Sequence, residues 1–177
     1  LTTVNAIVQR VPSRDVIRDA SRSFLIGSRV DLEDLGEFFV RNGFDRAGTV
    51  REPGEYAIRG GILDIFPPGE TLPVRVDLFG DEIEALRSFD PATQKSMDKV
   101  AKLVLQPANE AFLDADSIAR FRSGYREAFG SVTDDPLYAA VSEGQRHAGM
   151  EHWQALFFEK LESLFDYLPD ATVVLDH

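Results

Sequence analysis

The most restrictive feature of the sequence is a predicted β-hairpin near its centre. Two stretches rich in β-branched and aromatic residues, 74–79 and 82–89, are separated only by Gly80 and Asp81. A two-residue loop with glycine at its first position is typical of the tight turns that join antiparallel strands. The chain is therefore expected to contain an antiparallel sheet, with the pairing register fixed at this turn.

The register assigns the side chains of the hairpin to two faces. Phe79 is expected opposite Glu82 as the pair next to the turn. The apolar core face is expected to comprise Val74, Val76, Leu78, Ile83 and Ala85. The other face is expected to comprise Arg75, Asp77, Phe79, Glu82, Glu84 and Leu86. Asp77 then lies opposite Glu84, a like-charge pair that is destabilising unless a cation lies diagonally, and Arg75 is placed to supply that cation.

Other elements are expected around the hairpin. Asp31 is predicted to cap a helix over 32–42, in which apolar residues recur at helical spacing and which ends near Gly43. Further strands are predicted at residues 24–26, 56–66 and 100–105. The glycine pair Gly60-Gly61 interrupts the second of these strands and predicts either a bulge or the close approach of another backbone segment. Together they predict a meandering antiparallel sheet with the helix packed against it.

After residue 107 the pattern becomes helical. Helices are predicted over 116–129 and 135–142, followed by an aromatic-rich segment over 153–167. The fold class is therefore α+β: an antiparallel β-sheet domain with a packed helix, followed by a smaller, mostly helical unit. The two units are expected to join near residues 107–115.

Composition excludes several classes of protein. The chain has 30 acidic and 19 basic residues, a net charge of −11, whereas an autonomous nucleic-acid-binding protein needs a basic surface. Because it has no cysteine, disulfides, thiol catalysis and Cys-ligated metal sites are excluded. No apolar run approaches the roughly 18 residues of a membrane span. We expect a cytoplasmic protein, and the strand-like residues at its C-terminal end predict a fragment of a larger one.

The sequence offers little support for catalysis. No glycine is followed by lysine, so the phosphate-binding loop of nucleotide hydrolases is missing. The spacing of the three histidines does not suit a zinc site. The acidic pairs Asp114/Asp116 and Asp134/Asp135 are expected to be solvated residues that cap helices. We therefore predict no catalytic residue, no metal site and no cofactor.

A protein-interaction surface is the more specific hypothesis from these residues. A large aromatic such as Phe79, at the tip of a polar face, is either covered by a neighbouring loop or available to a partner. Arg75 shares that face, and Arg59 on the preceding strand alternates with Ile58 so that it faces the same side. Arginine beside an exposed aromatic ring is typical of interface hot spots. The alternative is an ordinary solvated sheet face with a local ion pair.

Three motifs show a family resemblance. They are GEYAIRGGILDIFP at residues 54–67, PVRVDLFGDEIE at 73–84 and SFDPATQ at 88–94. They closely resemble the UvrB-homology region of bacterial nucleotide-excision-repair proteins, which is shared by UvrB and the transcription-repair coupling factors. Residues 149–158 resemble the coupling factors and not UvrB. The resemblance extends over essentially the whole chain.

The resemblance implies a division into four segments. Residues 1–23 would be the end of a RecA-like segment with a linker, 24–108 a UvrA-binding domain, 109–169 a helical domain, and 170–177 the returning strand of the RecA-like domain. In UvrB that strand carries the Walker B acidic pair, and His177 stands here where the second acid would be. The departure implies a degenerate helicase module, with ATP hydrolysis and DNA translocation in another part of the full-length coupling factor.

The resemblance also implies the residues that contact UvrA. They are Arg59, Arg75 and Phe79, with Asp81 and Glu82 contributing at the rim. Contacts with other domains of the same protein are also implied, whereas RNA polymerase and DNA would be bound only through the full-length protein, and no membrane is involved. Two alternatives remain open: a fragment of UvrB, the ATP-dependent damage-verification subunit, and a region that only braces the RecA-like lobe.

Overall fold

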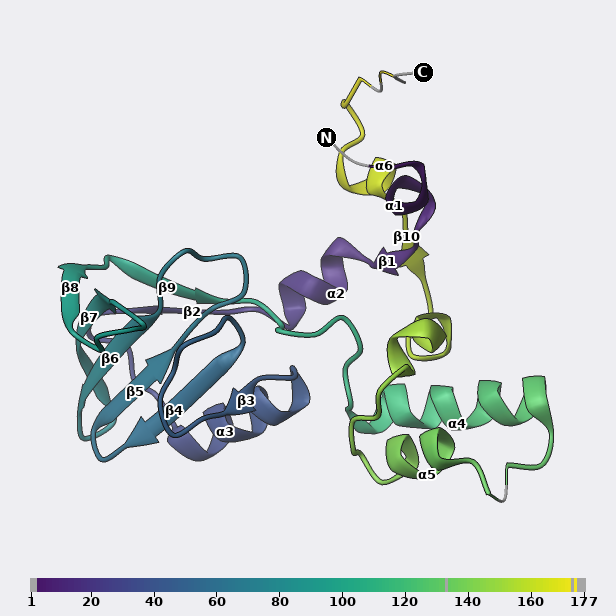
Figure 1. Cartoon of the computed structure of the whole chain (residues 1–177), viewed down its shortest axis with the longest axis horizontal. Helices are drawn as coiled ribbons and strands as arrows, with labels where there is room; N and C mark the ends of the chain where they lie inside the picture. The colour runs from purple at the N-terminus through teal and green to yellow at the C-terminus, as the bar shows by residue number, and fades with distance from the viewer. Residues whose placement is uncertain (1–2, 133, 173, 175–177) are drawn as a thin grey trace. The chain divides into compact units, whose positions relative to one another are not determined.

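The computed structural model describes residues 3–132, 134–172 and 174. The chain divides into two compact units, one of residues 18–112 and the other of residues 1–17 together with 113–177. The first is built mainly of strands and the second mainly of helices (Figure 1). The α+β class predicted from the sequence is confirmed, whereas the finer division into four segments stays a prediction.

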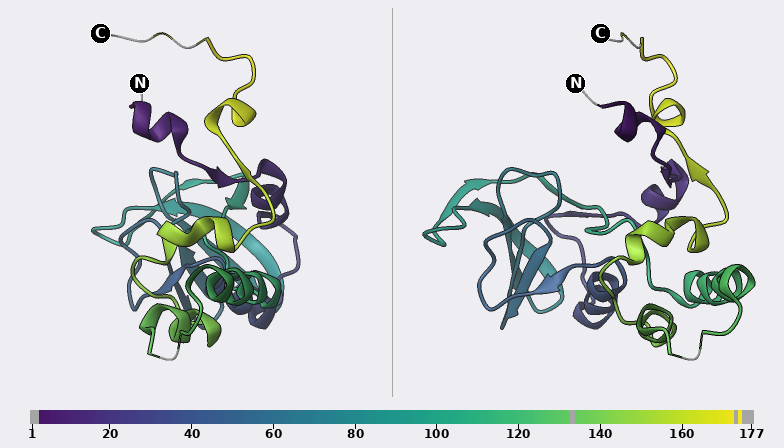
Figure 2. Two further views of the ribbon diagram at one scale, coloured as in Figure 1. Left: turned by 90° about the vertical axis from the view of Figure 1, so that its right-hand side faces the viewer. Right: turned by 45° about the vertical axis from the view of Figure 1, so that its right-hand side comes forward.

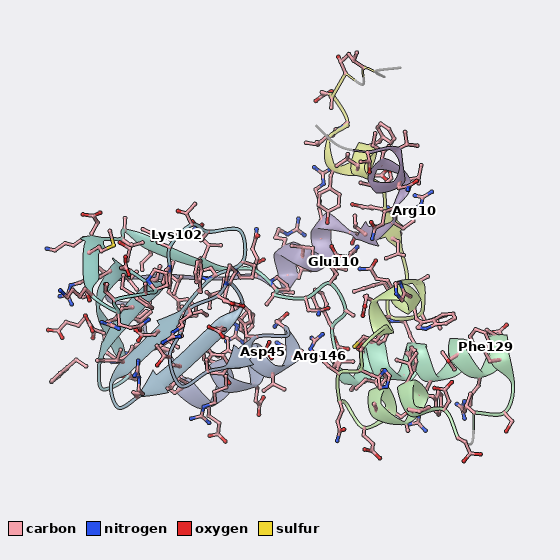
Figure 3. The ribbon with its side chains drawn as sticks, in the orientation of Figure 1. Arg10, Asp45, Lys102, Glu110, Phe129 and Arg146 are labelled. Carbon is pink, nitrogen blue, oxygen red and sulfur yellow. The ribbon has the colours of Figure 1, made fainter. Side chains whose placement is uncertain are left out.

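A six-stranded sheet forms most of the first unit. Its strand order is β3-β4-β5-β6-β7-β8, and all neighbours are antiparallel except β3 and β4, which are parallel. The strands are β3 (Asp45–Arg46), β4 (Glu55–Arg59), β5 (Ile62–Ile65), β6 (Val74–Phe79), β7 (Glu82–Phe89) and β8 (Ser96–Lys99). A separate antiparallel pair consists of β2 (Arg22–Leu25) and β9 (Lys102–Leu105), and Figure 3 marks Lys102 at the start of β9.

Helix α3 (Leu32–Arg41) packs against one face of the six-stranded sheet, as Figure 1 shows. Asp31 accepts hydrogen bonds from two backbone N–H groups of the first turn, and Gly43, with φ 77°, follows the last turn. Phe39 of α3 stacks on Tyr56 of β4 with the ring centroids 4.1 Å apart. The buried core between helix and sheet includes Leu35, Phe38, Leu63, Ile65, Val76, Ile83 and Leu86. The predicted helix, its cap and its packing are confirmed.

The prediction of a single strand over 56–66 is wrong. Gly60, with φ 59°, and Gly61 form the turn of a hairpin whose arms are β4 and β5. The backbone of β6 approaches this turn closely, since the N–H of Leu78 donates to the carbonyl oxygen of Gly61 at 2.7 Å. The predicted close backbone approach is confirmed. The alternative of a bulge is wrong, because the two glycines reverse the chain. The strand predicted at 100–105 is restricted to β9, and the short elements β3 and β8 were not predicted.

The second unit contains two neighbouring helices, α4 (Ala115–Phe129) and α5 (Pro136–Ser142), both close to their predicted positions. A 3₁₀ segment, η1 (Met150–Leu156), contacts α4, and Figure 3 marks Phe129 at the C-terminal end of that helix. None of the described helices has the length and hydropathy needed to cross a membrane.

Segments from the N-terminal and C-terminal parts of the chain also contact each other within the second unit. Helix α1 (Val4–Val8) contacts α6 (Leu164–Tyr167), and the short strands β1 (Val11–Pro12) and β10 (Leu161–Glu162) pair antiparallel (Figure 2). A short helix that was not predicted, α2, spans Arg14–Asp19. Of the strand predicted over 170–177, residues 170–172 and 174 are described and form no strand, whereas residues 173 and 175–177, including His177, lie outside the described residues.

Candidate functional site

The β6–β7 hairpin has the predicted turn but not the predicted register throughout. Phe79 lies opposite Glu82, as expected, whereas Asp77 lies opposite Ala85 because Glu84 is left without a partner in a β-bulge. The predicted like-charge pair of Asp77 and Glu84 is therefore wrong. The bulge also exchanges the next two side chains: Leu86 is 1% exposed in the core, and Ala85 moves to the opposite face.

The face of the sheet opposite α3 is called the outer face here. The register places on it Arg59 of β4, Ile62 and Asp64 of β5, Arg75, Asp77 and Phe79 of β6, and Arg87 of β7. Arg59 and Arg75 are not on adjacent strands, since β5 lies between β4 and β6. From β4 to β8 the sheet is a meander, as expected, but the strand that carries Arg59 pairs with β5 and not with the strand that carries Arg75.

A buried carboxylate brings the two predicted arginines together. Asp64 is 1% exposed. Its Oδ1 accepts a hydrogen bond from Arg75 Nε at 2.7 Å, and its Oδ2 accepts from Arg75 Nη2 at 2.9 Å and from Arg59 Nη2 at 3.0 Å. Charge-assisted and bidentate contacts of this kind are the strongest hydrogen bonds in proteins. Asp64 was not predicted from the sequence, although a lone acidic residue in an apolar strand is a signal, because a buried charge requires a partner.

The two arginines differ sharply in exposure. The side chain of Arg59 is 55% exposed and that of Arg75 is 18% exposed. Arg75 Nη1 also donates to the Gln94 carbonyl oxygen at 3.2 Å and to Ser96 Oγ at 3.3 Å. Its guanidinium lies 4.8 Å from the ring centroid of Phe89. The hydrogen bond to Asp64 raises the pKa of Arg75 above its ordinary value, so this side chain stays charged.

A second ion pair lies on the outer face between Arg87 Nη1 and Asp77 Oδ2. The cation beside Asp77 is therefore Arg87, and the prediction that Arg75 would fill this place is wrong. Arg75 and Arg87 lie directly opposite each other on β6 and β7. Because each guanidinium has its own carboxylate, on Asp64 and Asp77 respectively, this like-charge arrangement is compensated.

Phe79 is the most exposed aromatic side chain near these arginines, at 80%. Among the residues that the structure describes, no loop covers it. Two contacts hold the adjacent turn from one side. The carboxylate of Asp81 forms an ion pair with Arg29 Nη1 at 3.5 Å. The backbone carbonyl oxygen of Asp81 accepts a hydrogen bond from the N–H of Val30 at 2.7 Å. Glu82 is exposed beside it. The hairpin therefore holds Phe79 in solvent on a braced turn with acidic neighbours.

A groove of about 650 Å³ is hollowed into the outer face. Apolar side chains along it include Ile62 of β5 and Ile26 of the loop after β2, which are 39% and 55% exposed. The Asp77–Arg87 ion pair and Lys99 also line it. The outer face thus combines the partly exposed side chains of Arg59 and Arg87, 55% and 42% exposed, with one exposed ring and exposed aliphatic side chains. These are the components of a protein-binding surface.

One member of each acidic pair noted in the sequence caps a helix, and the other members, Asp116 and Asp134, are exposed. Asp114 and Asp135 are the N-cap residues of α4 and α5, and each accepts a hydrogen bond from a backbone N–H of its helix. In the described part of the chain, histidine and acidic side chains nowhere gather in threes as metal ligands would.

Comparison with known proteins places the chain in a family. Residues 23–111, half of the chain, match the family described as the UvrB interaction domain. Over its length the chain is 38% identical to the transcription-repair-coupling factor of Escherichia coli, 36% to that of Haemophilus influenzae and 30% to that of Bacillus subtilis. These alignments cover 97–99% of this chain but only 16% of each relative, so the chain spans a small part of the proteins it matches.

Proposed function

The chain belongs to the UvrB interaction domain family, and from that premise we propose that it is the part of a transcription-repair coupling factor that binds UvrA. In this role it recruits the excision-repair machinery to a stalled RNA polymerase in the cytoplasm. Binding of RNA polymerase and DNA, and the ATP-driven translocation, belong to other parts of the full-length protein. This region itself performs no catalysis.

The observation that carries the proposal is that Arg59 and Phe79 are both exposed on the outer face. The Arg59 side chain is 55% exposed and the Phe79 ring is 80% exposed, yet both lie on strands of one hydrogen-bonded sheet. Rigid strands hold such side chains ready for a partner, and arginines and aromatic rings dominate interface energetics. A net charge of −11 favours a protein partner over DNA.

We assign a different contact to each of these residues. Arg59 donates hydrogen bonds to a carboxylate of UvrA, and Phe79 fills an apolar recess on the partner. Asp81 and Glu82, at the acidic turn beside Phe79, contribute at the rim, where contacts are solvated and contribute little free energy. Arg75 supports the same surface. In the full-length protein, contact with another domain would mask this surface.

Calorimetric titration of the chain with UvrA tests this function. We expect the wild type to bind, and Arg59→Ala and Phe79→Ala each to weaken the affinity by about 2 kcal/mol or more, roughly thirtyfold. Arg46→Ala and Met97→Ala are matched controls, since Arg46 is exposed on β3 and Met97 is 50% exposed on β8, and neither should change the affinity. Absence of binding by the folded wild type would refute the proposal.

A further inference from the structure

We infer that Arg75 and Asp64 are positioning residues that act through Arg59, so that, of the two arginines bound to Asp64, only Arg59 presents its guanidinium to the partner. This inference rests on the proposed function and makes it more specific. It departs from the expectation, drawn from the family resemblance, that both arginines contact UvrA directly.

The hydrogen bonds of Arg75 leave it little capacity for a partner. A guanidinium has five N–H donors. Four hydrogen bonds within the chain use Nε, Nη2 and both N–H groups of Nη1, with Asp64, Gln94 and Ser96 as acceptors. The ring of Phe89 lies against the guanidinium, and the side chain is only 18% exposed. A carboxylate of another protein would have to displace these acceptors before it bound.

Arg59 has the opposite character. Its one hydrogen bond to Asp64 uses a single nitrogen, Nη2, and more than half of its side chain is exposed. That contact fixes the end of a long side chain without covering it. The loss of side-chain conformational entropy opposes binding. An arginine that is already fixed by a hydrogen bond loses less of this entropy when the partner binds.

Asp64 links the two arginines, because its carboxylate is hydrogen-bonded to both of them. Its Oδ2 accepts hydrogen bonds from Nη2 of both Arg59 and Arg75, at 3.0 and 2.9 Å. The additional bond from Arg75 Nε to Oδ1 makes the Arg75 contact bidentate, which sets the plane of the carboxylate. The two guanidinium groups and one carboxylate carry a net charge of +1. The surface is therefore suited to a single carboxylate of the partner.

The turn over residues 90–95 holds Arg75 from the other side. Gln94 adopts the left-handed conformation with φ 63°, and its carbonyl oxygen accepts from Arg75 Nη1. Gln94 Nε2 donates to the carbonyl oxygens of Val50 and Pro91, at 2.9 and 2.7 Å. Asp90 closes the turn by accepting from the N–H groups of residues 92 and 93. A chain of contacts thus runs from this turn through Arg75 and Asp64 to Arg59.

A double-mutant cycle measured by calorimetric titration with UvrA tests the inference. If Arg75 acts only through Arg59, Arg75→Ala weakens the affinity of the wild type about tenfold but changes that of the Arg59→Ala variant less than about threefold. If the two losses multiply, Arg75 makes its own contact and the inference is wrong. Retained affinity in Arg75→Ala alone would also overturn it.

Because Arg75→Ala leaves a buried carboxylate with one partner and can unfold the sheet, Arg75→Lys provides a second cycle. Lysine keeps the positive charge beside Asp64 but cannot form the bidentate contact. We expect Arg75→Lys to weaken UvrA binding about fivefold when Arg59 is present and not at all in the Arg59→Ala background. An equal loss in both backgrounds would overturn the inference.

Arg22→Lys is the matched control for this second cycle. Arg22 forms a bidentate contact with Asp34 elsewhere in the same unit, so its replacement should change UvrA affinity in neither background. If the wild type binds and Phe79→Ala weakens binding while the cycles are additive, only this inference fails. If the wild type does not bind, the proposed function fails with it.

Discussion

Because Gly61 has no side chain, the backbone of β6 at Leu78 can approach the turn between β4 and β5 closely. A Cβ added there would lie 2.9 Å from the carbonyl oxygen of Leu78, a backbone atom that cannot move without disturbing the sheet. We expect Gly61→Ala to lower the free energy of unfolding by about 1–3 kcal/mol, as overpacking does. Urea denaturation measures this. Gly48→Ala is the control, since no atom lies within 4 Å of its added Cβ, and an equal loss there would contradict the explanation.

The sequence predicted the outer-face residues better than it predicted their partners. Strand alternation placed Arg59, Arg75 and Phe79 on one face because that pattern is local. The role of Asp64 was missed, since its two arginines approach it from β4 and β6 and only the folded sheet brings the three strands together. The bulge at Glu84 was missed for a similar reason.

That bulge occurs where β7 meets a segment distant in sequence. The N–H of Ile83, beside the bulge, donates to the carbonyl oxygen of Ser28, and its own carbonyl oxygen accepts from the N–H of Gly27. The hairpin sequence alone carries no sign of this third partner. A register inferred from the turn therefore holds only as far as the pairs next to it, Phe79 with Glu82 and Leu78 with Ile83.

Two helices each contain a glycine, and their surroundings predict different responses to alanine. Gly36 lies inside α3, and no atom is within 4 Å of an added Cβ. Gly36→Ala should therefore raise the free energy of unfolding by about 0.5–1 kcal/mol through helix propensity. Gly124 of α4 differs, since its added Cβ would lie 2.9 Å from Leu156 Cδ2.

Leu156 has to move before alanine fits at Gly124, so Gly124→Ala should be less stabilising than Gly36→Ala, or destabilising. Chemical denaturation of both variants against the wild type measures the difference. Equal stabilisation at the two sites would show that the contact with Leu156 costs nothing.

The elements predicted correctly are those with signals in their own residues. Helix α3 has its cap at Asp31 and an apolar stripe, and the β6–β7 hairpin has its two-residue turn. Strand β8 was not predicted because all four of its residues are exposed and show no alternation. Strand β3 has two residues and exists only through parallel pairing with β4, which no local pattern specifies.

On the scale of the whole molecule, acidic side chains stabilise both units in the charged state. The pKa of Asp34 is lowered mainly by its hydrogen bond from Arg22, and that of Asp90 by the backbone N–H of Thr93. Hydrogen bonds from backbone N–H groups likewise lower the pKa values of Asp135 and Asp166 in the second unit. Each carboxylate is therefore harder to protonate in the folded chain than in the unfolded chain.

The unfolded chain consequently binds more protons in acid, and stability depends on pH in a definite direction. The contribution of these groups is complete above the ordinary carboxyl pKa of 3.8 and is lost as the pH falls through the lowered values of the folded state. We expect urea denaturation to show this loss below about pH 4. Asp90→Asn, which keeps an acceptor but removes the charge, should be less stable than the wild type at pH 7. As the pH falls through the lowered pKa of Asp90, this difference in stability should shrink, because protonation then removes the charge of Asp90 from the wild type as well. A difference that stays constant over this range would mean that Asp90 stabilises its turn without its charge.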